Sequence, residues 1–236
     1  MKNRLLAALA LVALAQPAFA VNNISTLQNL AQSEFRALSE DLGAALSYKP
    51  VTPAASLGVT GFDLGIGFSA TSLKSSASWG KATGSSLSTL PLPKIHLQKG
   101  LPAGFDIGGF FSAVPGTDIK LYGAELRYAI LSGGVTEPAV GVRGAFTRLS
   151  GVSQLSFDTQ SLDVSVSKGF AMLTPYAGVG EVWVDSTPNV AGLVAESFTK
   201  SKVFVGANFN LGVNLAVEYD KTGSVDTYSV KAGFRF

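Results

Sequence analysis

His96 is the only histidine in the 236-residue sequence, which contains no cysteine. The lack of cysteine excludes a disulfide framework, a thiolate metal site and a cysteine-linked lipid anchor. His96 lies between Lys94 and Gln98 where polar and apolar residues alternate, which predicts a strand. Asp63 or Asp106, predicted on neighbouring strands, could orient the imidazole for base catalysis. We expect a hydrogen-bonded interior histidine instead, because no motif fixes a nucleophile or second carboxylate beside it.

Other chemical signatures are missing from the sequence. It contains no phosphate loop, metal cluster or dinucleotide fingerprint, so we expect no enzyme, no cofactor and no metal site. There are 18 Lys and Arg against 16 Asp and Glu, and two of the basic residues, Lys2 and Arg4, belong to a predicted leader. The remaining chain is close to neutral, which argues against a nucleic-acid partner.

Residues 1–20 have the pattern of an export signal. Lys2 and Arg4 precede an apolar run, Leu5 to Ala15, that is too short to span a bilayer as a helix. Ala18 and Ala20 place small residues where a signal peptidase reads them. We therefore predict cleavage after Ala20, with the mature chain starting at Val21.

Residues 21–50 are predicted to contain an amphipathic helix. Apolar residues recur at steps of three and four from Val21 to Tyr48, and Pro50 and Pro53 close the segment. We expect this helix on the periplasmic side. Three placements remain open: on the inner-leaflet surface, inside the lumen as a plug, or against a periplasmic partner.

From Ala54 onward the apolar pattern changes to a period of two, which predicts strands. About ten segments alternate, namely 62–69, 94–98, 105–113, 122–130, 140–147, 161–167, 176–185, 202–210, 213–220 and 228–236. Hydrophobic residues make up 47% of the chain, yet no later stretch could be a transmembrane helix. In lipid only helices and closed barrels satisfy every backbone polar group. Residues 54–236 therefore predict an all-β membrane protein, a closed antiparallel transmembrane β-barrel of about ten strands, with eight or twelve as alternatives.

The connections between these segments fit such a barrel. The long polar stretches Ser72–Leu90, which contains Trp79 and Lys81, and Ser186–Lys200 fall on odd connections, where extracellular loops are expected. The stretch Ala54 to Leu73 leaves one bulged strand or a small hairpin open. A soluble sandwich is the alternative fold, but its strands rarely alternate so persistently.

The polar set of the alternation is predicted to line the lumen. Its charged and titratable members are Lys94, His96, Asp106, Glu125, Arg127, Arg143, Asp163, Glu181, Lys202, Glu218, Lys231 and Arg235. Both signs are mixed, and a barrel near eight strands is just filled by side chains. Two interpretations stay open, a narrow solute path and a closed, ion-paired interior.

The C-terminal stretch Tyr228-Ser-Val230-Lys-Ala232-Gly-Phe234-Arg-Phe236 resembles the terminal strand of outer-membrane proteins. Tyr228, Phe234 and Phe236 stand where that family carries its assembly signal, although Lys231 replaces the usual glycine. The segments 123–128, 141–144, 162–169 and 174–180 resemble an uncharacterised family of proteobacterial outer-membrane barrels. The resemblance implies location and fold, with barrel-assembly machinery and periplasmic chaperones as partners during biogenesis, and no activity.

These observations predict an outer-membrane protein of a Gram-negative bacterium that contacts membrane lipid and lipopolysaccharide. A porin-like narrow channel for small solutes is the leading hypothesis. The alternative is a closed structural or surface-interaction barrel that acts through its extracellular loops. A lipid-modifying or proteolytic enzyme ranks third.

Overall fold

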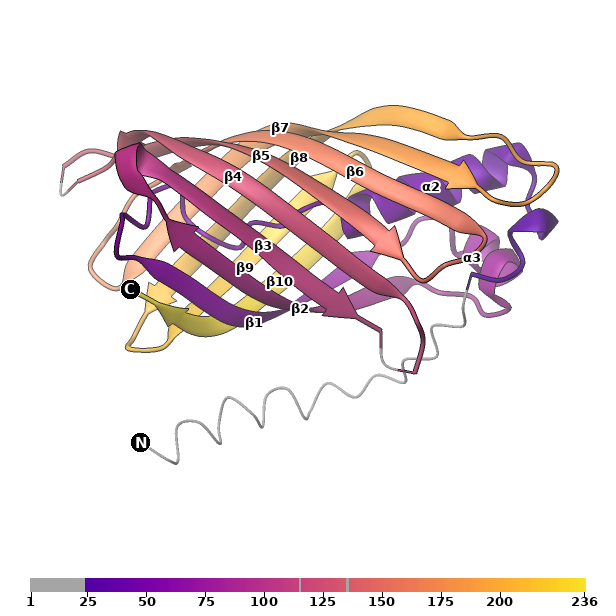
Figure 1. Cartoon of the computed structure of the whole chain (residues 1–236), viewed down its shortest axis with the longest axis horizontal. Helices are drawn as coiled ribbons and strands as arrows, with labels where there is room; N and C mark the ends of the chain where they lie inside the picture. Colours follow the sequence, from indigo (N-terminus) through magenta and orange to yellow (C-terminus); the bar gives the residue numbers. More distant parts are fainter. Residues whose placement is uncertain (1–23, 115, 135) are drawn as a thin grey trace.

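Ten strands form a closed antiparallel barrel in a computed structural model that describes residues 24–114, 116–134 and 136–236 (Figure 1). Each strand pairs with its neighbours in the chain, and β1 closes the ring against β10. This confirms the predicted fold class. The predicted cleavage residues Ala18 and Ala20 lie outside the described residues. The strands are β1 (Phe62–Ser72), β2 (Thr89–Gly100), β3 (Phe105–Ala113), β4 (Lys120–Ser132), β5 (Ala139–Ser150), β6 (Leu155–Ser167), β7 (Leu173–Pro188), β8 (Glu196–Asn210), β9 (Asn214–Thr222) and β10 (Val225–Arg235).

The outer face of the barrel is apolar around its circumference, because alternate residues of each strand point to opposite faces. Exposed side chains on it include Leu64, Ile66, Leu97, Ile107, Leu126, Val164, Val203, Val217 and Val230. Aromatic pairs stack beside this apolar zone, among them Phe111 with Tyr122 and Phe105 with Tyr128. In the described part of the chain, no helix is long and apolar enough to cross a membrane.

The N-terminal helix is shorter than the predicted span of residues 21–48. A 3-10 turn, η1 (Leu27–Asn29), precedes α2 (Gln32–Leu46). The Glu34 carboxylate accepts a hydrogen bond from the backbone N–H of Ala31 at 3.0 Å, which satisfies one free donor at the start of the helix. Ser47 is extended, and Pro50 follows, so the helix stops at Leu46.

Residues 24–61, called the plug below, enter the barrel. Helix α2 lies at the end opposite the C-terminus, and the chain then runs extended through the interior to Phe62, where β1 begins (Figure 1). Of the three placements left open, the structure has the plug, and the periplasmic-side position of the helix stays a prediction. The barrel also begins at Phe62 rather than at Ala54, with β1 as one strand. The reason is that side chains of the barrel wall bind residues 48–57, as described below.

The end of the barrel that holds α2 is called the loop end. There the connection between β1 and β2 folds into a short helix, α3 (Ser76–Thr83). Trp79, expected on a flexible surface loop, is buried and donates its indole N–H to Asp41 of α2 at 3.1 Å. The predicted long loop Ser186–Lys200 is mostly strand, since β7 continues to Pro188 and β8 starts at Glu196.

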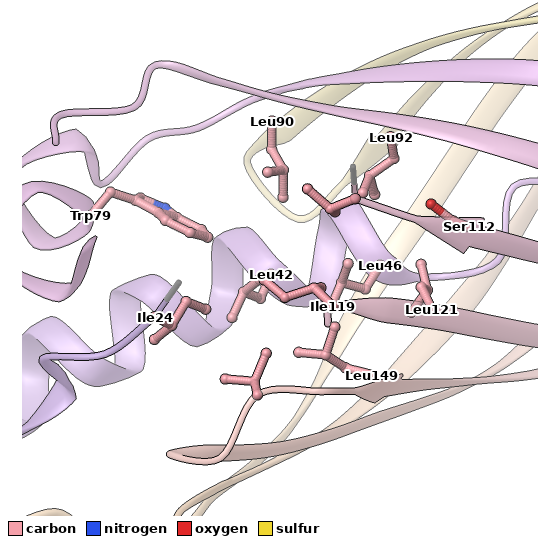
Figure 2. A pocket seen from close by; sticks show the side chains of 12 residues that line it. Ile24, Leu42, Leu46, Trp79, Leu90, Leu92, Ser112, Ile119, Leu121 and Leu149 are labelled. Carbon is pink, nitrogen blue, oxygen red and sulfur yellow. The ribbon is translucent and has the colours of Figure 1, made fainter. Parts of the chain in front are cut away.

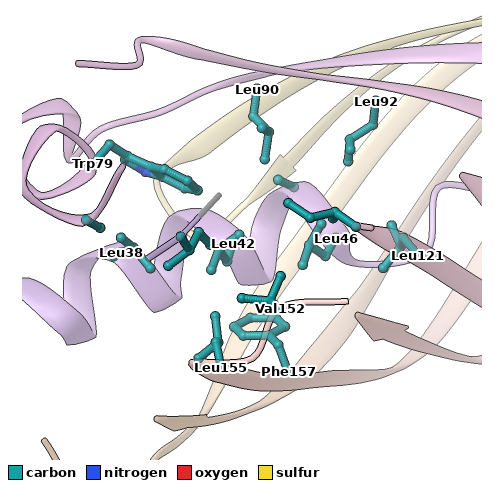
Figure 3. Close-up of a cluster of buried hydrophobic side chains, with 14 of the residues drawn as sticks. Leu38, Leu42, Leu46, Trp79, Leu90, Leu92, Leu121, Val152, Leu155 and Phe157 are labelled. Atoms are coloured by element: carbon teal, nitrogen blue, oxygen red, sulfur yellow. The ribbon is translucent and has the colours of Figure 1, made fainter. Parts of the chain in front are cut away.

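A hydrophobic core fills the loop half of the barrel. Leu38, Leu42 and Leu46 of α2 pack with inward-facing residues of the wall, including Leu121 and Phe157 (Figure 3). The fit against β7 is close, because a Cβ added at Gly43 would lie 2.7 Å from Val184 Cγ2. The interior of this half is thus built like the core of a soluble protein.

Replacing Asp41 by Ala should detach α3 from α2. The Asp41 carboxylate accepts hydrogen bonds from the backbone N–H groups of Lys74 and Ser75 as well as from Trp79. Loss of these acceptors should cost about 1–3 kcal/mol and shift Trp79 emission to the red, measured in a Trp183→Phe background. Asp41→Asn keeps one acceptor oxygen and should shift it less. Unchanged emission in Asp41→Ala would show that the contact does not hold α3.

Candidate functional site: the plugged lumen

The structure brings most of the predicted lumen residues together inside the barrel. They are Lys94, His96, Asp106, Glu125, Arg127, Arg143, Asp163, Lys202, Glu218 and Lys231, all buried, and Arg235, whose side chain is 14% exposed. They gather in the half of the barrel nearer the C-terminus, whereas the hydrophobic core fills the half at the loop end. Their side chains point inward, and their role as the lining of a lumen stays a prediction.

Glu181 is the exception and points outward. On β7 the inward-facing residues are Val182 and Val184, both buried, whereas Glu181 is exposed. The predicted orientation of this strand is wrong because it assumed a polar interior along the whole barrel. At this level the interior is occupied by α2, so the wall there presents apolar side chains inward.

Ion pairs connect the inward-facing charges around the wall. Asp106 binds Arg127 at 2.7 Å, Asp163 binds Arg143 at 2.6 Å, and Asp63 binds Lys231 at 2.8 Å. Asp63 and Arg235 also pair, at 3.1 Å. A buried charge is tolerated only when it is paired and hydrogen-bonded, so these pairs are a condition for the polar half of the interior.

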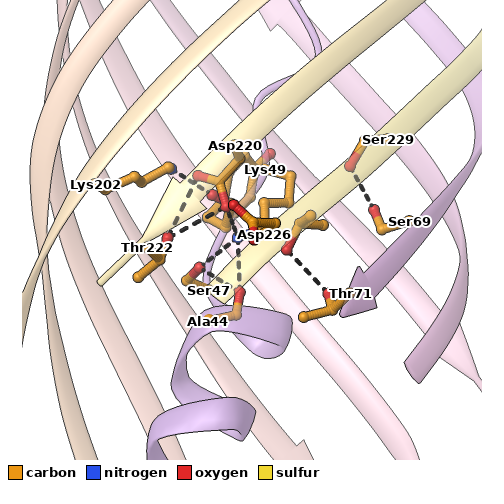
Figure 4. A network of polar contacts seen from close by, with 12 residues as sticks. Ala44, Ser47, Lys49, Ser69, Thr71, Lys202, Asp220, Thr222, Asp226 and Ser229 are labelled. Atoms are coloured by element: carbon orange, nitrogen blue, oxygen red, sulfur yellow. Dashed lines mark hydrogen bonds and ion pairs between the residues drawn. The ribbon is translucent and has the colours of Figure 1, made fainter. Parts of the chain in front are cut away.

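Lys49 of the plug inserts a further cation into this network (Figure 4). Its ammonium group, fully buried, binds Asp220 Oδ1 at 2.6 Å. It also donates to the carbonyl oxygen of Ala44 at 2.7 Å and to Ser47 Oγ at 2.8 Å. The Thr222 hydroxyl donates to the same carboxylate at 3.2 Å. Lys49 therefore anchors the end of α2 to β9.

The extended part of the plug is bound through its backbone. Lys202 donates to the carbonyl oxygen of Tyr48 at 2.8 Å, and the N–H of Val51 donates to Glu218 at 2.9 Å. Arg127 donates to the carbonyl oxygen of Pro53. Further along, the N–H of Leu57 donates to Asp106 Oδ1 at 2.9 Å. Since these partners come from several strands, the plug is held from around the ring rather than from one side.

One residue of the plug is strained. Val51 is buried and has a positive φ of 45°, a conformation that β-branched residues rarely adopt. Such strain costs on the order of 1–3 kcal/mol and persists only where the surroundings impose it. Here the hydrogen bond from Val51 to Glu218 and the flanking contacts impose it.

His96 and Lys94 are buried polar residues of β2. His96 packs against Phe110, with ring centroids 5.7 Å apart, while Asp63 and Asp106 are engaged by basic residues. In the described part of the chain, His96 Nδ1 and Lys94 Nζ have no hydrogen-bond partner. Nor do three His, Cys, Asp or Glu side chains of that part gather as a metal site would require.

The three residues predicted as an assembly signal lie on the outer face. Tyr228, Phe234 and Phe236 are all exposed. Phe236 and Phe62 exchange backbone hydrogen bonds of 2.8 and 3.0 Å, which extends the β1–β10 pairing that closes the barrel to the last residue. The assembly role itself stays a prediction.

Ion pairs at the loop end hold α2 to β8 and α3. Glu40 binds both Arg36 and Lys200 at 2.9 Å, and Glu34 binds Lys81. Burial alone would raise the pKa of Glu40, but Lys200 and Arg36 outweigh it and hold that pKa below its usual value. The Lys81 ammonium and the N–H of Ala31 likewise lower the pKa of Glu34.

Comparison with known proteins adds a distant likeness of shape. No protein-family model matches the chain, and no curated protein matches it. Among solved structures, the N-terminal β-barrel domain of Pseudomonas aeruginosa OprF is similar with 14% identity and a TM-score of 0.39, covering 73% of this chain and 97% of that one. Ail, the attachment invasion locus protein of Yersinia pestis, matches with 14% identity and a TM-score of 0.32, covering 75% and 99%. Neisserial surface protein A matches with 13% identity and a TM-score of 0.30, covering 74% and 94%.

Replacing Lys49 by Met should destabilise the barrel strongly. The change leaves the Asp220 carboxylate buried without its cation, at a cost of about 3–5 kcal/mol. The double variant Lys49→Met with Asp220→Leu should recover most of that loss, because it removes both charges. The measurement is the free energy of unfolding in urea from refolded barrels.

Lys74→Met is the matched control for Lys49→Met. Lys74 pairs with Asp226, but its side chain is 48% exposed, so its loss should cost less than about 1 kcal/mol. If Lys49→Met were as mild as Lys74→Met, the buried pair would not anchor the plug.

Acid should weaken the attachment of α2 at the loop end. A carboxyl group whose pKa is lowered in the folded state contributes stability above its unfolded pKa and loses it as pH falls through the folded pKa. For Glu40 and Glu34 this loss lies below their ordinary value of 4.5. The protection of α2 amides against hydrogen exchange, measured relative to their intrinsic exchange rate at each pH, should fall in that range. Glu40→Gln should remove part of the pH dependence, with an effect below about 1 kcal/mol because the pairs are solvated; an unchanged slope would contradict this assignment.

Proposed function

We propose that this chain is an integral outer-membrane β-barrel whose own N-terminal segment closes its lumen, and that it acts at the cell surface through its loop end. The observation that carries the proposal is the plug, which is bound along residues 48–57 by buried groups of the wall. A solute path would have to pass through this segment.

The outer-membrane location rests on the outer face and on the sequence. Leu64, Leu97 and Val164 belong to a ring of exposed apolar side chains, which water would disfavour and lipid would accept. The predicted signal in residues 1–20 would deliver the chain to the periplasm of a Gram-negative bacterium. Barrel-assembly machinery and periplasmic chaperones are its proposed partners during insertion, and lipid and lipopolysaccharide are its proposed neighbours afterwards.

The number of strands supports a closed interior. Eight strands leave an interior just filled by wall side chains, and aqueous channels appear near sixteen. Ten strands leave some additional room. In the loop half that room holds a helix, and in the other half it holds one extended chain with its ion pairs.

A narrow channel that opens when the plug moves is the second candidate. The strain at Val51 favours it, because releasing the plug would relieve the unfavourable φ. The wall charges that now bind the plug would then line a path of mixed sign. The third hypothesis, a lipid-modifying or proteolytic enzyme, stays a prediction.

Single-channel recording with a disulfide lock separates the two candidates. An ideal Cβ at Gly43 lies 3.6 Å from Val184 Cβ, within the range of about 3.5–4.5 Å that disulfides require. Gly43→Cys with Val184→Cys should therefore lock α2 to β7 in a chain that has no other cysteine. The wild-type chain and both redox states of the variant, each shown to be folded by circular dichroism, are recorded in planar bilayers.

The closed-barrel proposal expects no discrete openings in any of the three samples. Openings in the wild-type and reduced samples that disappear on oxidation would replace it with the plug-gated channel. Openings that persist in the oxidised sample would show that the plug does not close the lumen at all.

A further inference from the structure

The ladder between β2 and β3 stops before either strand ends. Among the described residues it runs from Gly100↔Asp106 to Ile95↔Phe111, although β2 extends back to Thr89 and β3 continues to Ala113. The other side of β2 is different, because β1 pairs with it from Lys99 through to Thr89. The upper part of β2 therefore has a neighbour on one edge and an interrupted ladder on the other.

Two prolines explain the interruption. Pro91 and Pro93 lack a backbone N–H, and β1 nevertheless pairs through both, as Ala70↔Pro91 and Phe68↔Pro93. Since a strand directs the N–H groups of alternate residues to opposite edges, the missing donors of both prolines fall on the edge that faces β3. The seam between β2 and β3 is thus weakest at the loop end.

An apolar cavity lies directly behind this seam (Figure 2). It has a volume of about 40 Å³, and Leu90 and Leu92 of β2 line it together with Ser112 of β3. Leu46 of α2 and Trp79 of α3 form part of its inner wall. A water-sized site needs on the order of 10–15 Å³, so the cavity can hold several methylene-sized groups.

The cavity is unsuited to water. A water molecule needs polar partners, and the lining is apolar except for the Ser112 hydroxyl, which has no hydrogen-bond partner among the described residues. The outer surface beside the seam is also apolar, with Ile95 and Phe111 exposed on it. The apolar inside and the apolar outside therefore lie on either side of the interrupted β2–β3 ladder.

The height of the seam relative to the membrane indicates what kind of molecule can enter the cavity. Ala70 of β1 pairs with Pro91 of β2 on one side and with Tyr228 of β10 on the other. Pro91 is therefore separated by a single strand from Tyr228, which is exposed on the outer face. Phe111 and Tyr122 form an aromatic pair on the opposite flank. Aromatic side chains at strand ends mark the membrane interface, so the seam lies at the interface of the leaflet at the loop end. The exposed apolar side chains of Ile95 and Phe111, which face the acyl chains, come directly next to it.

The geometry points to a lateral lipid site in which the end of an acyl chain from the surrounding membrane enters between β2 and β3 and occupies the cavity beneath Trp79. The site rests on the proposed membrane location, and it does not depend on whether the lumen conducts.

Fluorescence quenching by brominated lipid tests this site. In a Trp183→Phe background Trp79 is the single tryptophan, and it lines the cavity. The folded chain is placed in phosphatidylcholine vesicles with or without bromine on the acyl chains. Trp79 emission should fall in the brominated vesicles and resist iodide, a quencher confined to water.

Closing the seam should abolish the quenching. Pro93→Cys with Ala113→Cys, joined by a short bifunctional thiol reagent, ties β2 to β3 where the ladder is interrupted. Ile66→Cys with Ile95→Cys is the matched control, because these exposed residues pair across the intact β1–β2 ladder. Ser112→Leu fills the cavity from inside and removes the unpartnered hydroxyl, and it should also reduce quenching without loss of folding.

A separate reporter distinguishes failure of the site from failure of membrane insertion. Leu97→Trp, made with Trp79→Phe and Trp183→Phe, places the single tryptophan on the exposed apolar face. If this reporter is not quenched, the membrane proposal fails. If it is quenched while Trp79 is not, the lateral site is wrong. The site is equally wrong if quenching of Trp79 persists after the β2–β3 cross-link or if iodide quenches it.

Discussion

The interior of a closed ten-stranded ladder must be filled, and every charge placed there must be paired. The plug fills the interior and pairs several of its charges, whereas the ammonium group of Lys94 lies 4.7 Å from the centre of the Phe110 ring. Lys49 neutralises Asp220, and the backbone of residues 48–57 supplies partners for Lys202, Arg127, Asp106 and Glu218. Without the plug, several of these wall groups would lose the hydrogen bonds that its backbone supplies. The wall and the plug are therefore interdependent parts of one structure.

This constraint divides the barrel into two halves with different chemistry. Where α2 occupies the interior, the wall presents Leu121, Phe157 and Val184 inward and the packing is that of a soluble core. Where the chain is extended, its backbone N–H and C=O groups are not paired within a helix. Charged and hydroxyl groups of the wall bind several of them instead. The proposed lateral seam between β2 and β3 lies beside the apolar half, where Leu90 and Leu92 of β2 point inward.

Much of the fold follows from sequence because alternation is a local property. An approximate strand number and the inward direction of most charges could be predicted from the period of two, and the closed barrel from that period together with the apolar content and the lack of a helix able to cross a membrane. Glu181 was misplaced because Val182 and Val184 face a helix, and no local pattern shows which element lies opposite. The path of the plug was equally hidden, since Lys49 and Asp220 are distant in sequence. Pro91 and Pro93 were a visible signal for the weak seam, because prolines are confined to edges of sheets.

Hydrogen exchange of the plug amides tests the central claim most directly. The N–H groups of Val51, Ala54 and Leu57 donate to Glu218, Ser167 and Asp106 of the wall. If the plug fills the lumen as described, these amides should exchange as slowly as those of the strands around them, and Asp106→Ala should release Leu57 first. Exchange as fast as in an open loop, from a barrel whose strands remain protected, would contradict the account.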